Sequence, residues 1–212
     1  MRTEVLEQPP RPKQWRWWHG VAFYAGVRLA SWALSRAARR YARTRGLPAA
    51  SGSREAPAIF YRRQKLPWFA PPPEAFPIAW SINSAGLIAA GLRALNLPRR
   101  QPGRRAFLAL QAAGWGLFAS FDAAYFELRS RRNAARVTLP YAALTWASLR
   151  LALKPLRDRR LAWELAPVSA WMLLAVPLSL AQARPPELLP RGHAPEPGAA
   201  APEPAPDNRG SE

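Results

Sequence analysis

The longest uncharged stretch of this chain is the feature that most limits how it can fold. From Ala75 to Leu92 the sequence runs for 18 residues without a charged side chain. A helix of about 20 apolar residues crosses the hydrocarbon core of a bilayer, so the stretch has the length of a membrane span. Prolines stand at its entrance, where a helix can do without the N–H groups of its first turn. The stretch therefore predicts a membrane helix with a rigid start.

The distribution of charge decides between a membrane protein and a nucleic-acid-binding protein. The net charge is +18 in 212 residues, a balance that in a soluble chain indicates nucleic-acid binding. Here the arginines gather in short connections between apolar segments, at residues 36–45, 62–65, 99–105, 129–136 and 157–160. Basic groups at those places suit anionic lipid headgroups. We expect a lipid bilayer as partner, and no nucleic acid.

Five apolar segments predict an all-α fold, a five-helix transmembrane bundle. They cover residues 18–34, 75–96, 106–126, 137–153 and 165–183. Trp15, Trp17 and Trp18 crowd the start of the first segment, as expected at a membrane interface. Residues 36–66 are expected to form a long loop between the first two helices. The protein is thus predicted to be an integral, multi-pass membrane protein.

The two ends of the chain differ from this central domain, residues 18–183. Residues 1–17 form a polar N-terminal segment. Residues 184–212 are rich in proline, alanine and acidic residues, which cannot bury a core, so a disordered tail is expected. The lysines and arginines are nearly equal in number on the two sides of the predicted bundle. They therefore indicate neither its orientation nor the membrane in which it lies.

The residue types argue against metal and acid–base chemistry. The chain has no cysteine and two histidines, His19 and His193, which excludes disulfides, iron–sulfur clusters and thiolate zinc sites. Asp122 and Glu127 have no second carboxylate at catalytic spacing, and pairing with Arg28 or Arg136 or contact with headgroup water is expected instead. No catalytic residue, metal ligand or required cofactor is assigned.

Three motifs in order carry a resemblance to a known family. The first contains Lys65, Trp68, Pro71, Pro72, Phe76 and Trp80. It resembles the pattern K-P-x-W-x-P-P-x-x-x-F-x-x-V-W of the TspO/MBR family, the tryptophan-rich sensory and mitochondrial translocator proteins, with one extra residue after Trp68. The family continues with Leu-Tyr where this chain has Asn83 and Ser84.

The second and third motifs keep the family's spacing but change some of its residues. In the third apolar segment Phe118 and Phe121 stand where the family has Asn and Trp. In the fifth, Trp171 keeps its place, while Val168 replaces a tyrosine and Ser179 an asparagine. The resemblance covers roughly residues 18–183 and identifies the chain as a divergent member.

The resemblance implies a pocket within the bundle for a flat apolar ligand such as a porphyrin, haem or a sterol. Trp80 and Trp171 match the two tryptophans that face ligands in the family, and planar rings gain from offset stacking. The ligand-binding residues carried over are Trp80, Trp171, Phe76, Pro71, Pro72, Phe118, Phe121, Ala175 and Leu178. For the aromatic residues plain packing is the alternative, and for the prolines a helix cap. The family also dimerises through its third helix, and Gly114 and Gly116 would permit such a homodimer.

Three classes of function follow. The first is a membrane protein that binds, and moves or senses, the apolar ligand. The second is a structural or assembly protein with a vestigial pocket. The third is an enzyme that degrades porphyrin photochemically through its tryptophans. The replaced tyrosine and asparagine positions favour a ligand that differs from the family's porphyrin.

Overall fold

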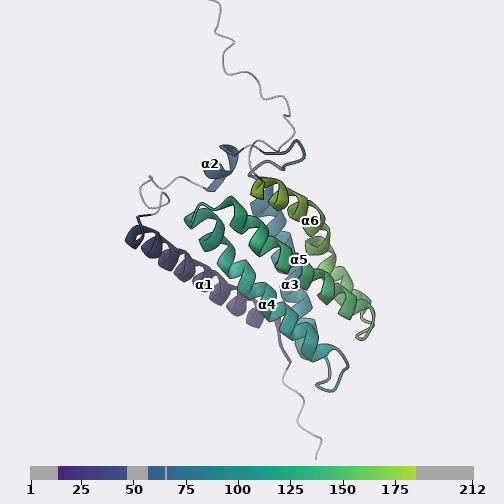
Figure 1. The fold of residues 1–212 in the computed structure, drawn as a ribbon. Helices are drawn as coiled ribbons and strands as arrows, with labels where there is room; N and C mark the ends of the chain where they lie inside the picture. The colour runs from purple at the N-terminus through teal and green to yellow at the C-terminus, as the bar shows by residue number, and fades with distance from the viewer. Residues whose placement is uncertain (1–13, 47–56, 65, 185–212) are drawn as a thin grey trace, which may run out of the picture.

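The structure, a computed structural model, describes residues 14–46, 57–64 and 66–184. Every regular element within these residues is helical, which confirms the predicted all-α bundle. The elements are α1 (Trp17–Thr44), α2 (Pro57–Arg62), α3 (Ala75–Asn96), α4 (Arg104–Asp122), the π-helical turn η2 (Ala123–Glu127), α5 (Arg131–Leu153) and α6 (Arg159–Ala183). Figure 1 shows the long helices packed together, with the short α2 at one end. The predicted tail lies outside the described residues, except for Arg184.

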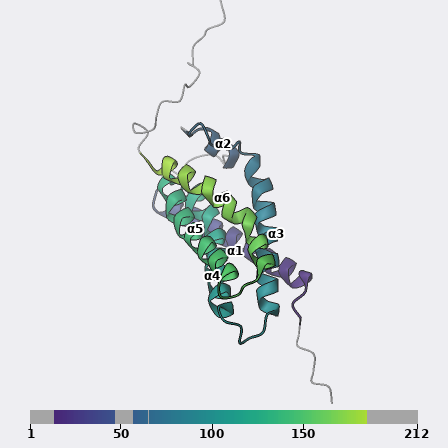
Figure 2. The same cartoon turned by 90° about the vertical axis from the view of Figure 1, so that its right-hand side faces the viewer.

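The helices pack in an order that differs from their order in the chain. α5 packs against α4 and α6, α6 packs against α3, and α1 packs against α4 and η2. Figure 2 shows α6 between α5 and α3. The fully buried side chains on α6 include Leu161, Leu165 and Val168. This helix therefore lies at the centre of the packing, in contact with both neighbours.

The predicted helix ends are wrong where arginines adjoin an apolar segment. α1 continues to Thr44, and α2 occupies part of the expected loop over residues 36–66. α5 and α6 begin at Arg131 and Arg159, six residues before the starts predicted at 137 and 165. Arginine is a good helix former, and its long side chain reaches polar surroundings from a buried helix. A charged residue ends the apolar segment without ending the helix.

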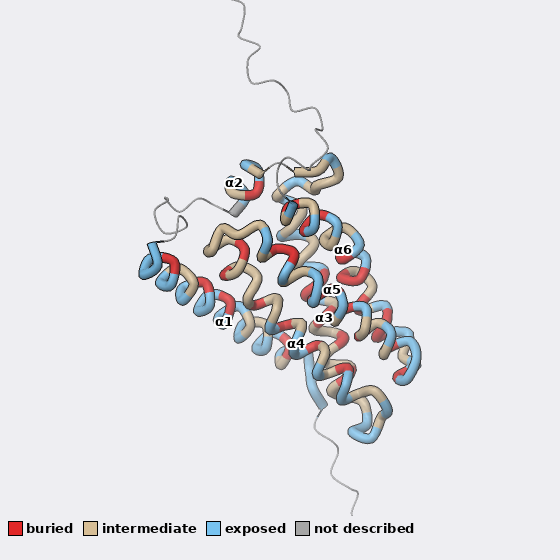
Figure 3. The backbone as a smooth tube through the Cα atoms, in the orientation of Figure 1, coloured by how far each residue is buried: buried red, intermediate tan, exposed pale blue. Residues whose placement is uncertain are grey.

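Many large apolar side chains lie exposed on the outside of this bundle, and some polar ones are buried within it. Trp17 is 73% exposed and Leu173 is 68% exposed. Asn83, Gln111 and Ser148 are buried. Figure 3 shows the outward side of α1 exposed along its length. Such an arrangement is typical of helices in lipid, and α3 and α6 are long and apolar enough to cross a bilayer.

The closest approach between α3 and α6 depends on a glycine. A Cβ atom added to Gly86 would lie 2.3 Å from the backbone carbonyl oxygen of Glu164. Further along α3, Arg93 binds the Glu164 carboxylate with Nε at 2.9 and 3.1 Å and Nη2 at 2.7 Å. The missing Cβ atom at Gly86 allows the close contact between α3 and α6, and the ion pair stabilises it.

Candidate functional site

Aromatic rings from five helices meet at the end of the bundle where α3 begins. Phe76 and Trp80 are one turn apart on α3, so they share a face. The Phe76 ring packs edge-on against Trp171 of α6, at 5.6 Å between centroids, and against Tyr61 of α2 at 5.0 Å. We call these rings, with the two described next, the ring group: Tyr61, Phe76, Trp80, Phe118, Tyr141 and Trp171.

Trp80 extends the ring group into the bundle. Its ring centroid lies 5.1 Å from that of Phe118 on α4 and 5.8 Å from that of Tyr141 on α5. Trp80 and Trp171 are both partly buried against the core. Among the described residues no ring contact joins Trp80 to Phe76 or Trp171, so the ring group consists of two contact sets that share one face of α3.

Of the other predicted site residues, two follow Trp171 on α6 and one contacts η2. Ala175 and Leu178 follow Trp171 at helical spacing, so they lie on the same side of α6. Ala175 packs against the core and Leu178 is 5% exposed. Phe121 lies elsewhere, because its ring contacts are with Tyr125 and Phe126 of η2.

Pro71 and Pro72 lie in the segment that joins α2 to α3, and contacts with α2 hold the second half of this segment. The Tyr61 hydroxyl donates a hydrogen bond of 3.1 Å to the carbonyl of Pro71. Burial, with a smaller contribution from Tyr125, raises the pKa of Tyr61 to about 12, so this donor keeps its proton at neutral pH. Arg62 pairs with Glu74, and the hydrogen bonds of the Glu74 carboxylate to its own backbone and to Arg62 lower its pKa.

Tyr125, which the sequence analysis did not select, joins η2 to α6 and to the residues around α2. Its hydroxyl accepts hydrogen bonds from Gln64 Nε2 at 2.7 Å and from Gln182 Nε2 of α6 at 3.2 Å. Its ring also packs against Phe60 of α2 at 5.5 Å. A π-helical turn, often found at functional sites, carries this tyrosine. Its place in an aromatic run between two acidic residues was the available signal.

We expect Tyr125→Phe to release the segment around Gln64 from the bundle. The substitution keeps the ring but removes the acceptor of Gln182 Nε2 and leaves Gln64 Nε2 only a 3.4 Å bond to the Phe60 carbonyl, at a cost of about 1–3 kcal/mol. Hydrogen exchange should rise over residues 57–64, and limited proteolysis there should accelerate. Tyr41→Phe is the matched control, because Tyr41 is exposed and its hydroxyl has no hydrogen-bond partner in the described structure. Unchanged exchange in Tyr125→Phe would contradict the role of this hydroxyl.

The interior also holds polar atoms without partners and a small cavity. Asn83 Nδ2 and Ser84 Oγ, just past Trp80, are buried and have no hydrogen-bond partner. A cavity of about 10 Å³ lies between α3, α4 and α5, lined in part by Leu87, Gln111 and Thr145. It has room for about one water molecule. This cavity is too small for a porphyrin or a sterol.

Asp122 and Glu127, the acidic residues singled out in the sequence, both lie close to arginines of α1. Asp122 lies 3.9 Å from Arg28, as one of the predicted pairings has it, whereas Glu127 pairs with Arg39 of α1. No group of three potential ligands occurs among the described residues. The arrangement offers flat apolar faces and two unpaired polar atoms rather than an acid–base pair.

Comparison with protein families gives one match. The model of the TspO/MBR family matches residues 42–184, more than half of the chain, and this segment contains α2 to α6 with the whole ring group. No curated protein matches the chain. The family comprises membrane proteins of the translocator and sensory type, and α3 and α6 have the length and apolar character of membrane spans. The chain belongs to the TspO/MBR family.

Proposed function

We propose that this protein is a multi-pass membrane protein that binds a flat apolar ligand at the ring group and moves or senses it. The ligand class is a porphyrin, haem, a sterol or a similar molecule. The observation that carries the proposal is the meeting of Phe76 with Trp171, from the two most apolar helices, beside Trp80. Aromatic faces at this place would stack on a planar molecule and bury a large area of it.

The neighbours of Trp80 favour an apolar ligand with a small polar part. Phe118 contributes a ring where the family pattern has an asparagine, which makes this side of the group less polar. Asn83 and Ser84 supply a buried amide and a buried hydroxyl close by in sequence, both without partners. A buried polar group without a partner is costly, so a ligand that bonds to one of them would gain affinity.

Titration of the detergent-purified protein tests this proposal. The probes are protoporphyrin IX, haem and a fluorescent sterol, followed by tryptophan quenching or by energy transfer from tryptophan. We expect a saturable signal with at least one of them. No signal with any probe would overturn the proposal and favour the structural or assembly role. Protein-dependent loss of the porphyrin spectrum under light would instead favour the photochemical enzyme.

We expect reporter fusions at residues 1 and 212 to report opposite sides of the membrane. The reason is that α1, α3, α4 with η2, α5 and α6 would give five crossings, an odd number. A reporter fused near residue 100, in the connection between α3 and α4, should share the side of residue 1. Both termini on one side would remove a crossing and contradict the five-span arrangement.

A further inference from the structure

The C-terminal end of α1 extends beyond the length that a bilayer core requires. The helix has 28 residues, which corresponds to about 42 Å, whereas the hydrocarbon core is about 30 Å thick. The distance along the helix from Trp18 to Arg36 is about 27 Å. A core-spanning part that starts at Trp18 therefore ends near Arg36, and the last turns reach the headgroup region.

One face of α1 changes from apolar to basic at this level. Leu29 is 65% exposed and Trp32 is 54% exposed. Arg36, Arg40 and Arg43 continue the same face at spacings of four and three residues, and all three are exposed. The Arg36 guanidinium lies over the Trp32 ring, 5.2 Å from its centroid. A tryptophan beneath a row of cations is the pattern expected at a membrane interface.

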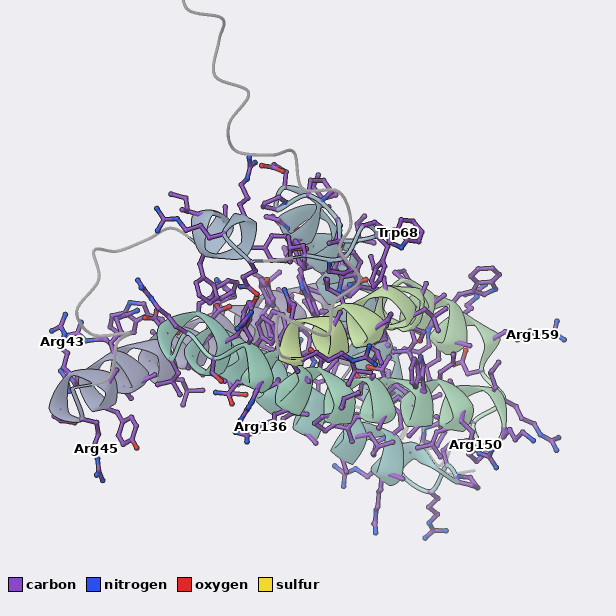
Figure 4. All side chains as sticks on the ribbon, turned by 45° about the horizontal axis from the view of Figure 1, so that its top comes forward. Arg43, Arg45, Trp68, Arg136, Arg150 and Arg159 are labelled. Carbon is purple, nitrogen blue, oxygen red and sulfur yellow. The ribbon has the colours of Figure 1, made fainter. Side chains whose placement is uncertain are left out.

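Contacts on the opposite face fix the direction in which these arginines point. Ser31, Ser35 and Ala42 are buried. Ser31 Oγ donates a 3.3 Å hydrogen bond to Asp122, and Arg39 pairs with Glu127 of η2. The structure describes no ion pair for Arg36, Arg40, Arg43 or Arg45. Figure 4 shows Arg43 and Arg45 at the end of α1, away from the other helices, while Arg150 and Arg159 lie at the other end of the bundle.

We propose that this end of α1 binds anionic phospholipid headgroups of the adjoining leaflet. We call Arg36, Arg40, Arg43 and Arg45 the α1 basic face. A guanidinium binds phosphate oxygens in a two-pronged geometry, and three of them on one rigid helix, with Arg45 at its C-cap, can hold neighbouring headgroups together. Arg36 and Arg40 of this face precede residue 42, where the match to the family model begins. The inference rests on the part of the proposed function that places α1 in the bilayer, and not on the ligand.

Lipid binding to the full chain in detergent tests the proposal by native mass spectrometry. The probes are phosphatidylglycerol and phosphatidylcholine of the same acyl composition. We expect phosphatidylglycerol to bind the parent more tightly. In the Gln variant, all four arginines of the α1 basic face are replaced by glutamine. The affinity of this variant for phosphatidylglycerol should be lower by about tenfold or more. The Lys variant of the same four positions should bind phosphatidylglycerol more tightly than the Gln variant and less tightly than the parent, because the charge remains while the two-pronged contacts are lost.

The other end of the bundle provides the matched control. It offers four exposed arginines for replacement by glutamine, namely Arg99, Arg100, Arg150 and Arg159. This variant has the same net charge as the Gln variant of the α1 basic face, and its affinity for phosphatidylglycerol should fall clearly less, because its arginines do not form one row on a single helix. Equal losses in both variants would overturn the proposal, because total charge would then explain binding. Lack of any preference in the parent would overturn it too. These measurements use no porphyrin or sterol. A failed ligand titration would therefore not affect the test of lipid binding.

Discussion

Gly86→Ala is expected to lower the stability of the bundle by about 1–3 kcal/mol. The added methyl group would lie 2.3 Å from the carbonyl oxygen of Glu164, a distance that no rotamer change can relieve because both atoms belong to the backbone framework. α3 and α6 must therefore separate, and the packing of Ala90 and Ala94, which are 0% exposed, would loosen with them. The apparent melting temperature in detergent should fall by several degrees.

Gly91→Ala on the same helix provides the control for this prediction. A Cβ atom at Gly91 meets nothing within 4 Å. Alanine is also favoured over glycine within a helix, by roughly 0.5–1 kcal/mol. This variant should match or exceed the parent in stability. If both alanine variants melt together, the close approach of α3 and α6 is not what limits stability.

The ion pair between Arg93 and Glu164 should give the second large effect. Removing one partner, as in Arg93→Met or Glu164→Gln, should cost about 1.5–3 kcal/mol, since three charge-assisted hydrogen bonds join these side chains. The double variant should recover part of the loss, because it leaves neither group without its partner. Thermal unfolding of the four proteins in detergent gives the coupling between the two side chains.

Arg62 and Glu74 form the comparison pair for that cycle. Both side chains are 63% exposed, so water screens their attraction. Their coupling should be clearly smaller than that of Arg93 and Glu164. Equal coupling in the two pairs would show that the Arg93 pair lies in water and does not join α3 to α6 as the structure indicates.

The sequence was most informative where the apolar segment had sharp limits. For the second segment the predicted span, residues 75–96, matches α3 at both ends. Helices flanked by arginines were predicted too short, because hydropathy measures the apolar part and not the helix. The short α2 had no periodicity to reveal it, and its position depends on rings and hydrogen bonds from distant parts of the chain.

The residues of the candidate site were also only partly predictable from the sequence. Phe76, Trp80 and Trp171 could be selected from the family's spacing. Phe118, which contacts Trp80, was selected in the same way. Tyr61 and Tyr141 were not, because they lie outside the motifs and meet α3 only through tertiary packing. Phe121 shows the limit of the spacing argument. It keeps the motif position, but the structure places its ring against η2 and outside the ring group.

Ligand affinity in the tryptophan variants tests the central claim most directly. For a probe that binds the parent, we expect Trp80→Ala and Trp171→Ala each to weaken binding by about 5- to 150-fold, or about 1–3 kcal/mol, from the lost stacking face and buried area. Trp163→Ala should bind as the parent does, since Trp163 is 78% exposed on the outside of α6. Each variant is first shown to be as monodisperse as the parent. Parent-like affinity in both Trp80→Ala and Trp171→Ala would place the ligand away from the ring group and contradict the account.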